Sequence, residues 1–207
     1  RYRTRRENLT LSKKTNMSDL YTAKDYKHLL GLSGFSDTML TNHFTLYEGY
    51  VKNVNLLVEK LEAIENQSSP EASELERRFG WEWNGMRMHE LYFENMSKEG
   101  KEIGPSTKEK IEKIYGSYEK WVECFKAKGI MRGIGWVVLF EDQTNGELFT
   151  TWIREHEQGI LANGKILLVM DCWEHAYMTD YGIKKADYIE VFMRAIDWSV
   201  VEKRLVA

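Results

Sequence analysis

The sequence predicts an α+β protein in which an N-terminal antiparallel helical hairpin precedes a C-terminal domain with a small three-stranded antiparallel sheet and surrounding helices. Two observations predict this class. Over the first half of the chain, apolar side chains recur at three- and four-residue steps, the period of an amphipathic helix. In the second half, three short apolar runs stand between turn-forming residues, which is the pattern of strands. Helices followed by a small sheet indicate the α+β class.

The first predicted helix covers residues 36–64, where apolar and aromatic side chains keep a helical spacing. The stretch 66–70, Asn-Gln-Ser-Ser-Pro, ends it, because proline and small polar residues break helices. A second helix is predicted to start near residue 71 and to run to residue 96, with Gly80 and Gly85 as candidate interruptions. Two consecutive helices with a short connection fold back on each other, so a hairpin is expected.

A change of composition separates the two parts. Residues 98–106 combine glycine and proline with charged side chains, which predicts a linker and a boundary near residue 100. We therefore expect a helical hairpin domain over 18–100 and an α+β domain over 101–207. The pair Asn145–Gly146 favours a tight turn between the first two strands. The elements predicted after the linker are one helix, three strands and closing helices, at residues 107–127, 135–140, 147–152, 166–170 and 174–207.

The net charge of −3 is unevenly distributed. The first sixteen residues carry six basic side chains and one acidic side chain, a net of +5, which leaves −8 for the rest. An acidic body lacks the cationic surface that binds phosphates, so neither nucleic acid nor a membrane surface is an expected partner. Residues 1–17 are interpreted as a basic arm that is expected to be disordered.

The cysteine content indicates the kind of cellular compartment in which the protein is expected. Only Cys124 and Cys172 are present, and two cysteines do not make a disulfide framework. The expected compartment is therefore reducing. That means the cytoplasm, or an organelle if the basic arm is a transit segment. No apolar run reaches the length of a membrane span, and 43% hydrophobic with 29% charged residues is ordinary for a globular protein.

The most informative stretch is 171–177, Asp-Cys-Trp-Glu-His-Ala-Tyr. It follows the apolar run 166–170, so Asp171 is expected at the end of a buried strand, with His175 about one helical turn further on. An aspartate and a histidine placed in this way can converge on one metal ion. The alternative is that Asp171 caps the next helix and His175 is a half-buried packing residue. The pair alone leaves both interpretations open.

Two further histidines favour the metal interpretation. His43 and His89 each lie on the apolar face of one predicted hairpin helix. A single histidine on such a face is more often a hydrogen-bonded core residue than a ligand. Two of them on helices that face each other favour a shared role as ligands.

Three motifs in this chain resemble those of the iron/manganese superoxide dismutase family. Residues 171–177 match its signature D-x-W-E-H-A-Y, and residues 133–136 resemble its G-x-G-W strand start. Residues 89–95 resemble its second-helix pattern H-x-x-Y/F-W-x-N, with Phe93 in place of tryptophan. The similarity runs in order from about Leu29 to the C-terminus.

The resemblance implies a mononuclear metal site and an activity. It implies the ligands His43, His89, Asp171 and His175, one ion per subunit, and iron as the metal, with manganese as the alternative. The implied reaction converts superoxide to oxygen and hydrogen peroxide. Zinc suits such ligands but does not change oxidation state. The alternatives are a non-haem iron oxygenase, and a non-catalytic or differently reacting metal-binding relative of the same fold.

The resemblance also implies residues around the metal. His156 lies fifteen residues before Asp171, where some family members have the histidine that stands beside the metal's solvent ligand; the alternative is a surface histidine. Trp136 and Trp173 are expected to form apolar walls.

The gateway phenol is either Tyr50 or Tyr47, because the family pattern H-x-x-x-H-x-x-x-Y is one residue shorter here. One explanation for the shorter spacing is a π-bulge in other members that this helix lacks. If the register is instead kept to Tyr50, Asn42 falls on the ligand position and His43 does not.

The resemblance finally implies a homodimer, with a tetramer as a further state. In the family, the residue that matches Glu174 binds a metal-ligand histidine of the partner subunit. Met178 and Tyr47 stand where the family has a tyrosine and a second histidine that bond to each other across the interface. We therefore expect a dimer that keeps the Glu174 bridge and lacks the other one. Lys185 lies near the position of an arginine that guides anions in the family.

Overall fold

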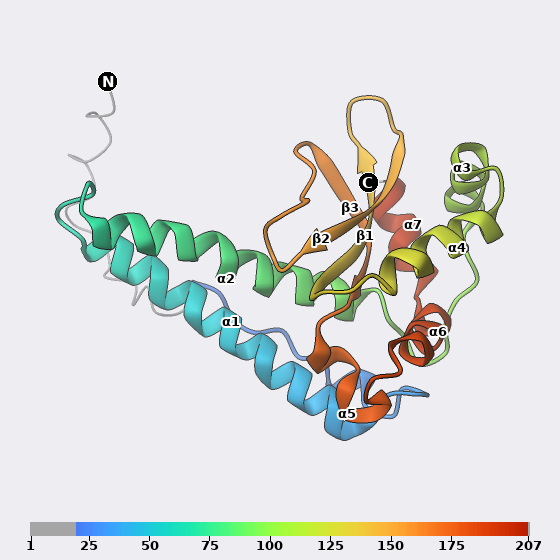
Figure 1. The fold of residues 1–207 in the computed structure, drawn as a ribbon, viewed down its shortest axis with the longest axis horizontal. Helices are drawn as coiled ribbons and strands as arrows, with labels where there is room; N and C mark the ends of the chain where they lie inside the picture. Colours follow the sequence, from blue (N-terminus) through green and yellow to red (C-terminus); the bar gives the residue numbers. More distant parts are fainter. Residues whose placement is uncertain (1–19, 207) are drawn as a thin grey trace.

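The computed structural model describes residues 20–206, so the predicted basic arm lies outside the described residues. Its secondary structure confirms the predicted fold class, with a helical hairpin followed by a mixed part that holds a three-stranded antiparallel sheet (Figure 1). Within the described range, no helix combines the length and the apolar character needed to cross a membrane.

Helices α1 (Asp37–Ala63) and α2 (Pro70–Glu94) form the hairpin, and both start at serine caps. The Ser36 hydroxyl accepts a hydrogen bond from the backbone N–H of Met39 at 3.0 Å. Ser69 caps α2 in the same way, and a proline in the first turn supports that start. The expected interruptions at Gly80 and Gly85 do not occur, because α2 stays α-helical through both glycines. The hairpin therefore presents two long, continuous faces to each other.

The single helix predicted over 107–127 is two helices, α3 (Pro105–Tyr115) and α4 (Tyr118–Gly129). The break lies at Gly116, whose φ of 88° is left-handed and terminates α3. The Ser117 hydroxyl then caps α4. The Gly116–Ser117 pair is thus the local sequence signal for the break between the two helices, which the spacing of apolar residues did not reveal.

The sheet has strand order β2-β1-β3, and both pairs are antiparallel. Its strands are β1 (Gly135–Asp142), β2 (Leu148–Arg154) and β3 (Gly164–Asp171). In this register Trp136 lies between Ile153 of β2 and Asp171 of β3. One end of the sheet therefore brings together the start of β1, the end of β3 and the residues that follow β2.

Short helices close the chain, and the first two of them contact α1 of the hairpin. In Figure 1 the hairpin extends to the left of the sheet, whereas α3, α4, α6 and α7 lie to its right. Buried hydrophobic residues from both parts form one continuous core. The remaining elements are η2 (Lys27–Leu29), η3 (Glu174–Ala176), α5 (Met178–Tyr181), α6 (Lys185–Ala195) and α7 (Trp198–Val206).

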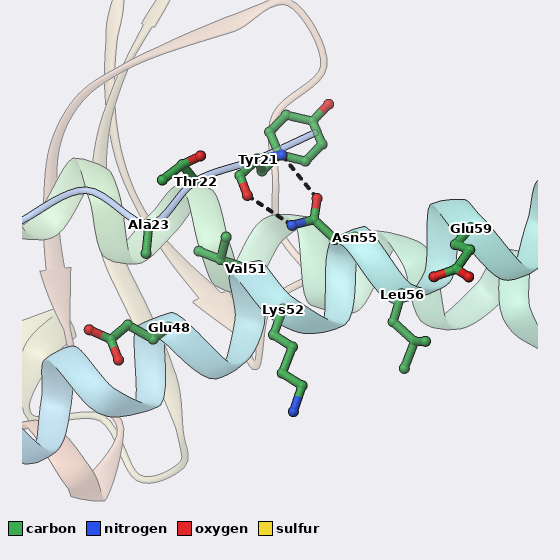
Figure 2. Close-up of a pocket in the computed structure, with 9 residues that line it drawn as sticks. All are labelled: Tyr21, Thr22, Ala23, Glu48, Val51, Lys52, Asn55, Leu56 and Glu59. Carbon is green, nitrogen blue, oxygen red and sulfur yellow. Dashed lines mark hydrogen bonds between the residues drawn. The ribbon is translucent and has the colours of Figure 1, made fainter. Parts of the chain in front are cut away.

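An extended segment before η2 is held against α1 by one amide. The Asn55 side chain accepts from the Tyr21 backbone N–H at 2.9 Å and donates to the Tyr21 carbonyl at 2.8 Å (Figure 2). Both backbone groups of Tyr21 are thereby satisfied without a neighbouring strand. A shallow groove runs beside this contact, with Leu56 exposed on it.

The end of α2 is tied to the free edge of β3 by Asn95. Its side chain accepts from the Val169 N–H at 2.9 Å and donates to the Val169 carbonyl at 3.1 Å. Arg204 of α7 donates to the Leu167 carbonyl at 3.1 Å on the same edge. These bonds satisfy edge groups that would otherwise be unpaired. They also fix β3 against α2 two residues before Asp171.

We expect Asn95→Ala to lower the free energy of unfolding by about 2–4 kcal/mol, because it leaves the buried N–H and carbonyl of Val169 without partners. The matched control is Asn42→Ala, at an exposed position in α1, which we expect to be neutral or to stabilise by up to about 0.7 kcal/mol. Urea unfolding of the two variants and of the unaltered protein measures both effects. Equal effects of the two substitutions would contradict the role given to Asn95.

Candidate metal centre

Four side chains from four different elements converge at the end of the sheet that faces the hairpin. Their ligand atoms all lie within 4.8 Å of one another. From Asp171 Oδ2, the distance to His43 Nε2 is 3.1 Å, to His175 Nε2 3.0 Å and to His89 Nε2 3.7 Å. Three of the side chains are buried, and that of His175 is 26% exposed. The structure thus brings together all four ligands that the sequence suggested.

The hydrogen bonds of His89 show which nitrogen is free for a metal. Its Nδ1 lies 2.6 Å from the carbonyl oxygen of Gly85, so Nδ1 carries the proton and donates it. Its Nε2 is then a bare lone pair. This atom is fully buried and has no hydrogen-bond partner among the described residues. An unsatisfied buried acceptor is costly unless something binds it, and a metal ion at this point fits.

The charge state of the site also suits a cation. Burial by itself would raise the pKa of Asp171, but the neighbouring His175 and the hydrogen bonds from His175 and His43 hold the pKa well below its usual range. Burial lowers the pKa of both His43 and His89, so their imidazoles stay neutral. The Trp173 backbone N–H donates to the second Asp171 oxygen at 2.7 Å. The ionised carboxylate of Asp171 and the neutral imidazoles of His43 and His89 are therefore left to face a cation.

His156 is buried next to the four ligands, so it is not a surface residue. The Trp136 indole N–H donates to His156 Nδ1 at 3.1 Å, so the proton of the neutral ring is on Nε2. This nitrogen lies 2.8 Å from the Tyr50 hydroxyl oxygen and donates to it. Burial lowers the pKa of His156 to about 4, which keeps the ring neutral. Asn84 holds the loop by donating to the His156 carbonyl at 2.9 Å.

Aromatic rings enclose the site. Trp173 stacks on His156 with ring centres 4.7 Å apart, and Trp136 meets His89 edge-on at 5.0 Å. A third tryptophan, Trp81, packs edge-on against His156 at 4.9 Å. Trp81 lies outside the sequence motifs described above. Its spacing could have pointed to it, because Trp81 lies about two helical turns before His89, near the same face of α2.

The two candidate gateway tyrosines point to different places. Tyr50 reaches His156, whereas the Tyr47 hydroxyl donates to Glu90 at 3.0 Å and accepts from the Lys24 backbone N–H at 3.0 Å. Helix α1 is α-helical from end to end. Asn42, the alternative ligand position, is exposed.

The remaining residues singled out in the sequence lie at the edge of the site. Glu174 and Met178 are both exposed. Lys185 lies over the Trp152 ring, 5.2 Å from its centre, and donates to the Met131 carbonyl at 3.3 Å. The Lys185 ammonium is therefore occupied by neighbours at the end of α4 and in β2.

This geometry defines a class: a protein with a largely buried candidate site for a metal ion, made of three imidazoles and one aspartate, with side chains from both parts of the chain. Comparison with known proteins is consistent with this class. A family model described as "Iron/manganese superoxide dismutases, C-terminal domain" matches residues 102–204.

Curated relatives cover most of the chain. The chain is 33% identical to "Superoxide dismutase [Fe]" of Cupriavidus metallidurans, over 85% of this chain and 91% of the relative. It is 35% identical to "Superoxide dismutase [Mn] 2" of Haloferax volcanii, over 79% of this chain and 83% of the relative. It is also 32% identical to "Superoxide dismutase [Fe]" of Saccharolobus solfataricus, over 77% of this chain. The chain belongs to the iron/manganese superoxide dismutase family.

The packing of Tyr50 on Gly85 makes a testable contrast between two helical glycines. A Cβ at Gly85 would lie 2.5 Å from the Tyr50 ring, whereas a Cβ at Gly49 would have no neighbour within 4 Å among the described residues. We expect Gly85→Ala to lower the free energy of unfolding by about 1–3 kcal/mol through overpacking. We expect Gly49→Ala to raise it by about 0.5–1 kcal/mol through helix propensity. Denaturant unfolding of both variants measures the sign of each change in the free energy of unfolding. If Gly49→Ala destabilised the protein and Gly85→Ala did not, the packing described here would be contradicted.

Proposed function

We propose that this protein is a superoxide dismutase that uses one iron ion per subunit, with manganese as the alternative metal. The observation that carries the proposal is the convergence of four potential ligand atoms, all within 4.8 Å of one another, one of which is the unpartnered, buried Nε2 of His89. The names of the relatives support the activity, and these names include both metals.

The reaction converts two superoxide anions and two protons into oxygen and hydrogen peroxide. When bound, the ion supplies a one-electron change of oxidation state, which the side chains themselves lack. The imidazoles of His43, His89 and His175 and the ionised carboxylate of Asp171 would hold the ion. Second-shell contacts fix the orientation of the ligands, in particular the Gly85 carbonyl at His89 and the Trp173 N–H at Asp171.

Tyr50 and His156 are proposed to manage protons beside the ligands. Burial raises the pKa of Tyr50, so its phenol keeps its proton. Because His156 donates to the Tyr50 oxygen, the Tyr50 hydroxyl proton is free to be donated elsewhere. The tryptophans exclude bulk water and larger molecules. The pair thus offers an oriented proton donor next to a small, dry site.

The first test removes ligands. We expect His89→Ala and Asp171→Ala each to lose the bound metal and to lower superoxide turnover by at least about 100-fold, since each removes a direct ligand. The control is His28→Ala, at an exposed histidine of η2, which should keep both. Metal analysis and superoxide decay after loading with iron or manganese measure the outcome.

The results separate the alternatives. Normal turnover in either ligand variant would contradict the assignment. Stoichiometric metal with no superoxide turnover in the unaltered protein would favour a non-catalytic or differently reacting relative. If the protein turned over superoxide only when loaded with manganese, manganese would take the place of iron as the proposed metal.

A homodimer is also part of the proposal, with Glu174 bridging to the partner subunit's His175. It is supported by two features of the monomer: Glu174 is exposed, and His175 is the one ligand whose side chain is partly open. We expect Glu174→Ala to weaken the dimer measurably in sedimentation velocity, because it removes a charge-assisted contact on both sides of the two-fold axis. Glu147→Ala, an exposed change just before β2, is the control. A monomeric unaltered protein at micromolar concentration would refute this part.

A further inference from the structure

A cavity of about 210 Å³ lies between α1 and α2 at the position of Tyr50. Tyr50 is half-buried, and its hydroxyl bonds to His156, so the cavity connects solvent to the residues beside the metal ligands. Its lining comes from both helices and includes Tyr50, Asn53, Arg78, Trp81 and Glu82.

Among the described residues of this lining, Arg78 is the only cationic side chain, and it is held in place by a buried carboxylate. Its Nε and Nη2 lie 2.7 and 2.6 Å from one oxygen of Glu82, whose side chain is only 3% exposed. The other Glu82 oxygen accepts from the Asn53 amide at 3.1 Å. Both oxygens of Glu82 are therefore engaged, and the orientation of the guanidinium is fixed.

The guanidinium still faces the cavity's solvent with unused donors. The Arg78 side chain is 54% exposed. Among the described residues its hydrogen bonds go to Glu82 alone, so part of its five N–H groups is free for an anion. Its central carbon lies 5.6 Å from the centre of the Trp81 ring, and the same ring packs on His156. A positive charge thus stands one aromatic ring away from His156.

A fixed positive charge would help an anion to approach a protein that is otherwise acidic. Outside the first sixteen residues the net charge is −8, and the Glu157 carboxylate lies close to α2, 3.6 Å from where a side chain at Gly80 would begin. Such surroundings repel a small anion. Glu82 offsets part of the charge of Arg78, but the Glu82 side chain is 3% exposed and the Arg78 side chain is 54% exposed, so an anion in the cavity meets the positive end of the pair first.

We propose that the cavity between α1 and α2 is the approach for the anionic substrate and that Arg78, fixed by Glu82, guides the anion to Tyr50. The inference rests on the proposed function, because it names a guiding residue for that same site. Arg78 does not touch the metal ligands, so its role is in substrate capture.

The test compares two neighbouring arginines. Arg77 pairs with Glu74 on the surface and is 75% exposed, so Arg77→Gln makes the same change of charge outside the cavity lining. Two rates are measured on iron-loaded protein: kcat/KM for superoxide, and the association rate of azide from stopped-flow absorbance. At low ionic strength we expect Arg78→Gln to lower both rates by about threefold to tenfold, and Arg77→Gln to lower them far less.

Salt and a conservative variant identify the cause. The deficit of Arg78→Gln should shrink towards none as salt rises, because screening removes the guidance in the unaltered protein too. Arg78→Lys, which keeps the charge, should stay within about twofold of the unaltered protein. The proposal is overturned if Arg77→Gln and Arg78→Gln behave alike, if the deficit persists at high salt, or if Arg78→Lys loses as much as Arg78→Gln.

Failure of the proposed function would look different. In that case the unaltered protein would bind iron but would not turn over superoxide. The azide association rates of the variants would still decide whether Arg78 guides anions.

Discussion

One carboxylate oxygen, Oδ2 of Asp171, is the point on which the structure depends. It lies within 3.7 Å of three imidazole nitrogens, which come from α1, α2 and η3. An ionised carboxylate with no exposed surface is costly unless partners surround it, and here the partners are the other ligands. Packing the hairpin against the sheet therefore satisfies the buried charge and assembles the site in the same step.

The sheet register and the end of α2 determine where that oxygen lies. Asn95 fixes Val169 to α2, and two residues later β3 ends at Asp171. Across the strand pair, Trp136 faces Asp171, so its indole is placed to donate to His156. The protonation of His156, and with it the direction of its bond to Tyr50, follows from this register. Stability and proton arrangement are thus set by the same backbone contacts.

Much of the site could be predicted from the sequence, because its ligands sit in local patterns. Asp171 and His175 lie within one motif, and His43 and His89 lie on apolar helix faces, so residue type and spacing suggest them, and the resemblance to the family completes the set. The choice between Tyr47 and Tyr50 stayed open because both lie near the face of α1 that carries His43, and only tertiary packing separates them. Gly85 was predicted to interrupt α2. The structure shows instead that a glycine is needed there because the Tyr50 ring of α1 packs directly against it, a contact that the local sequence does not reveal.

The contacts of Tyr47 bear on what surrounds Tyr50. Tyr47 is bound to Glu90 and to the Lys24 backbone, so it offers no hydrogen bond toward the site. Among the described residues, the hydrogen-bond partner of the Tyr50 hydroxyl is His156, which itself donates and so leaves that hydroxyl proton uncommitted. On the cavity side, Tyr50 shares a polar lining with Asn53, Glu82 and Arg78. Protons and anions would then reach the metal centre by the same short route between α1 and α2, and the two helices that supply two of the ligands would also control access to them.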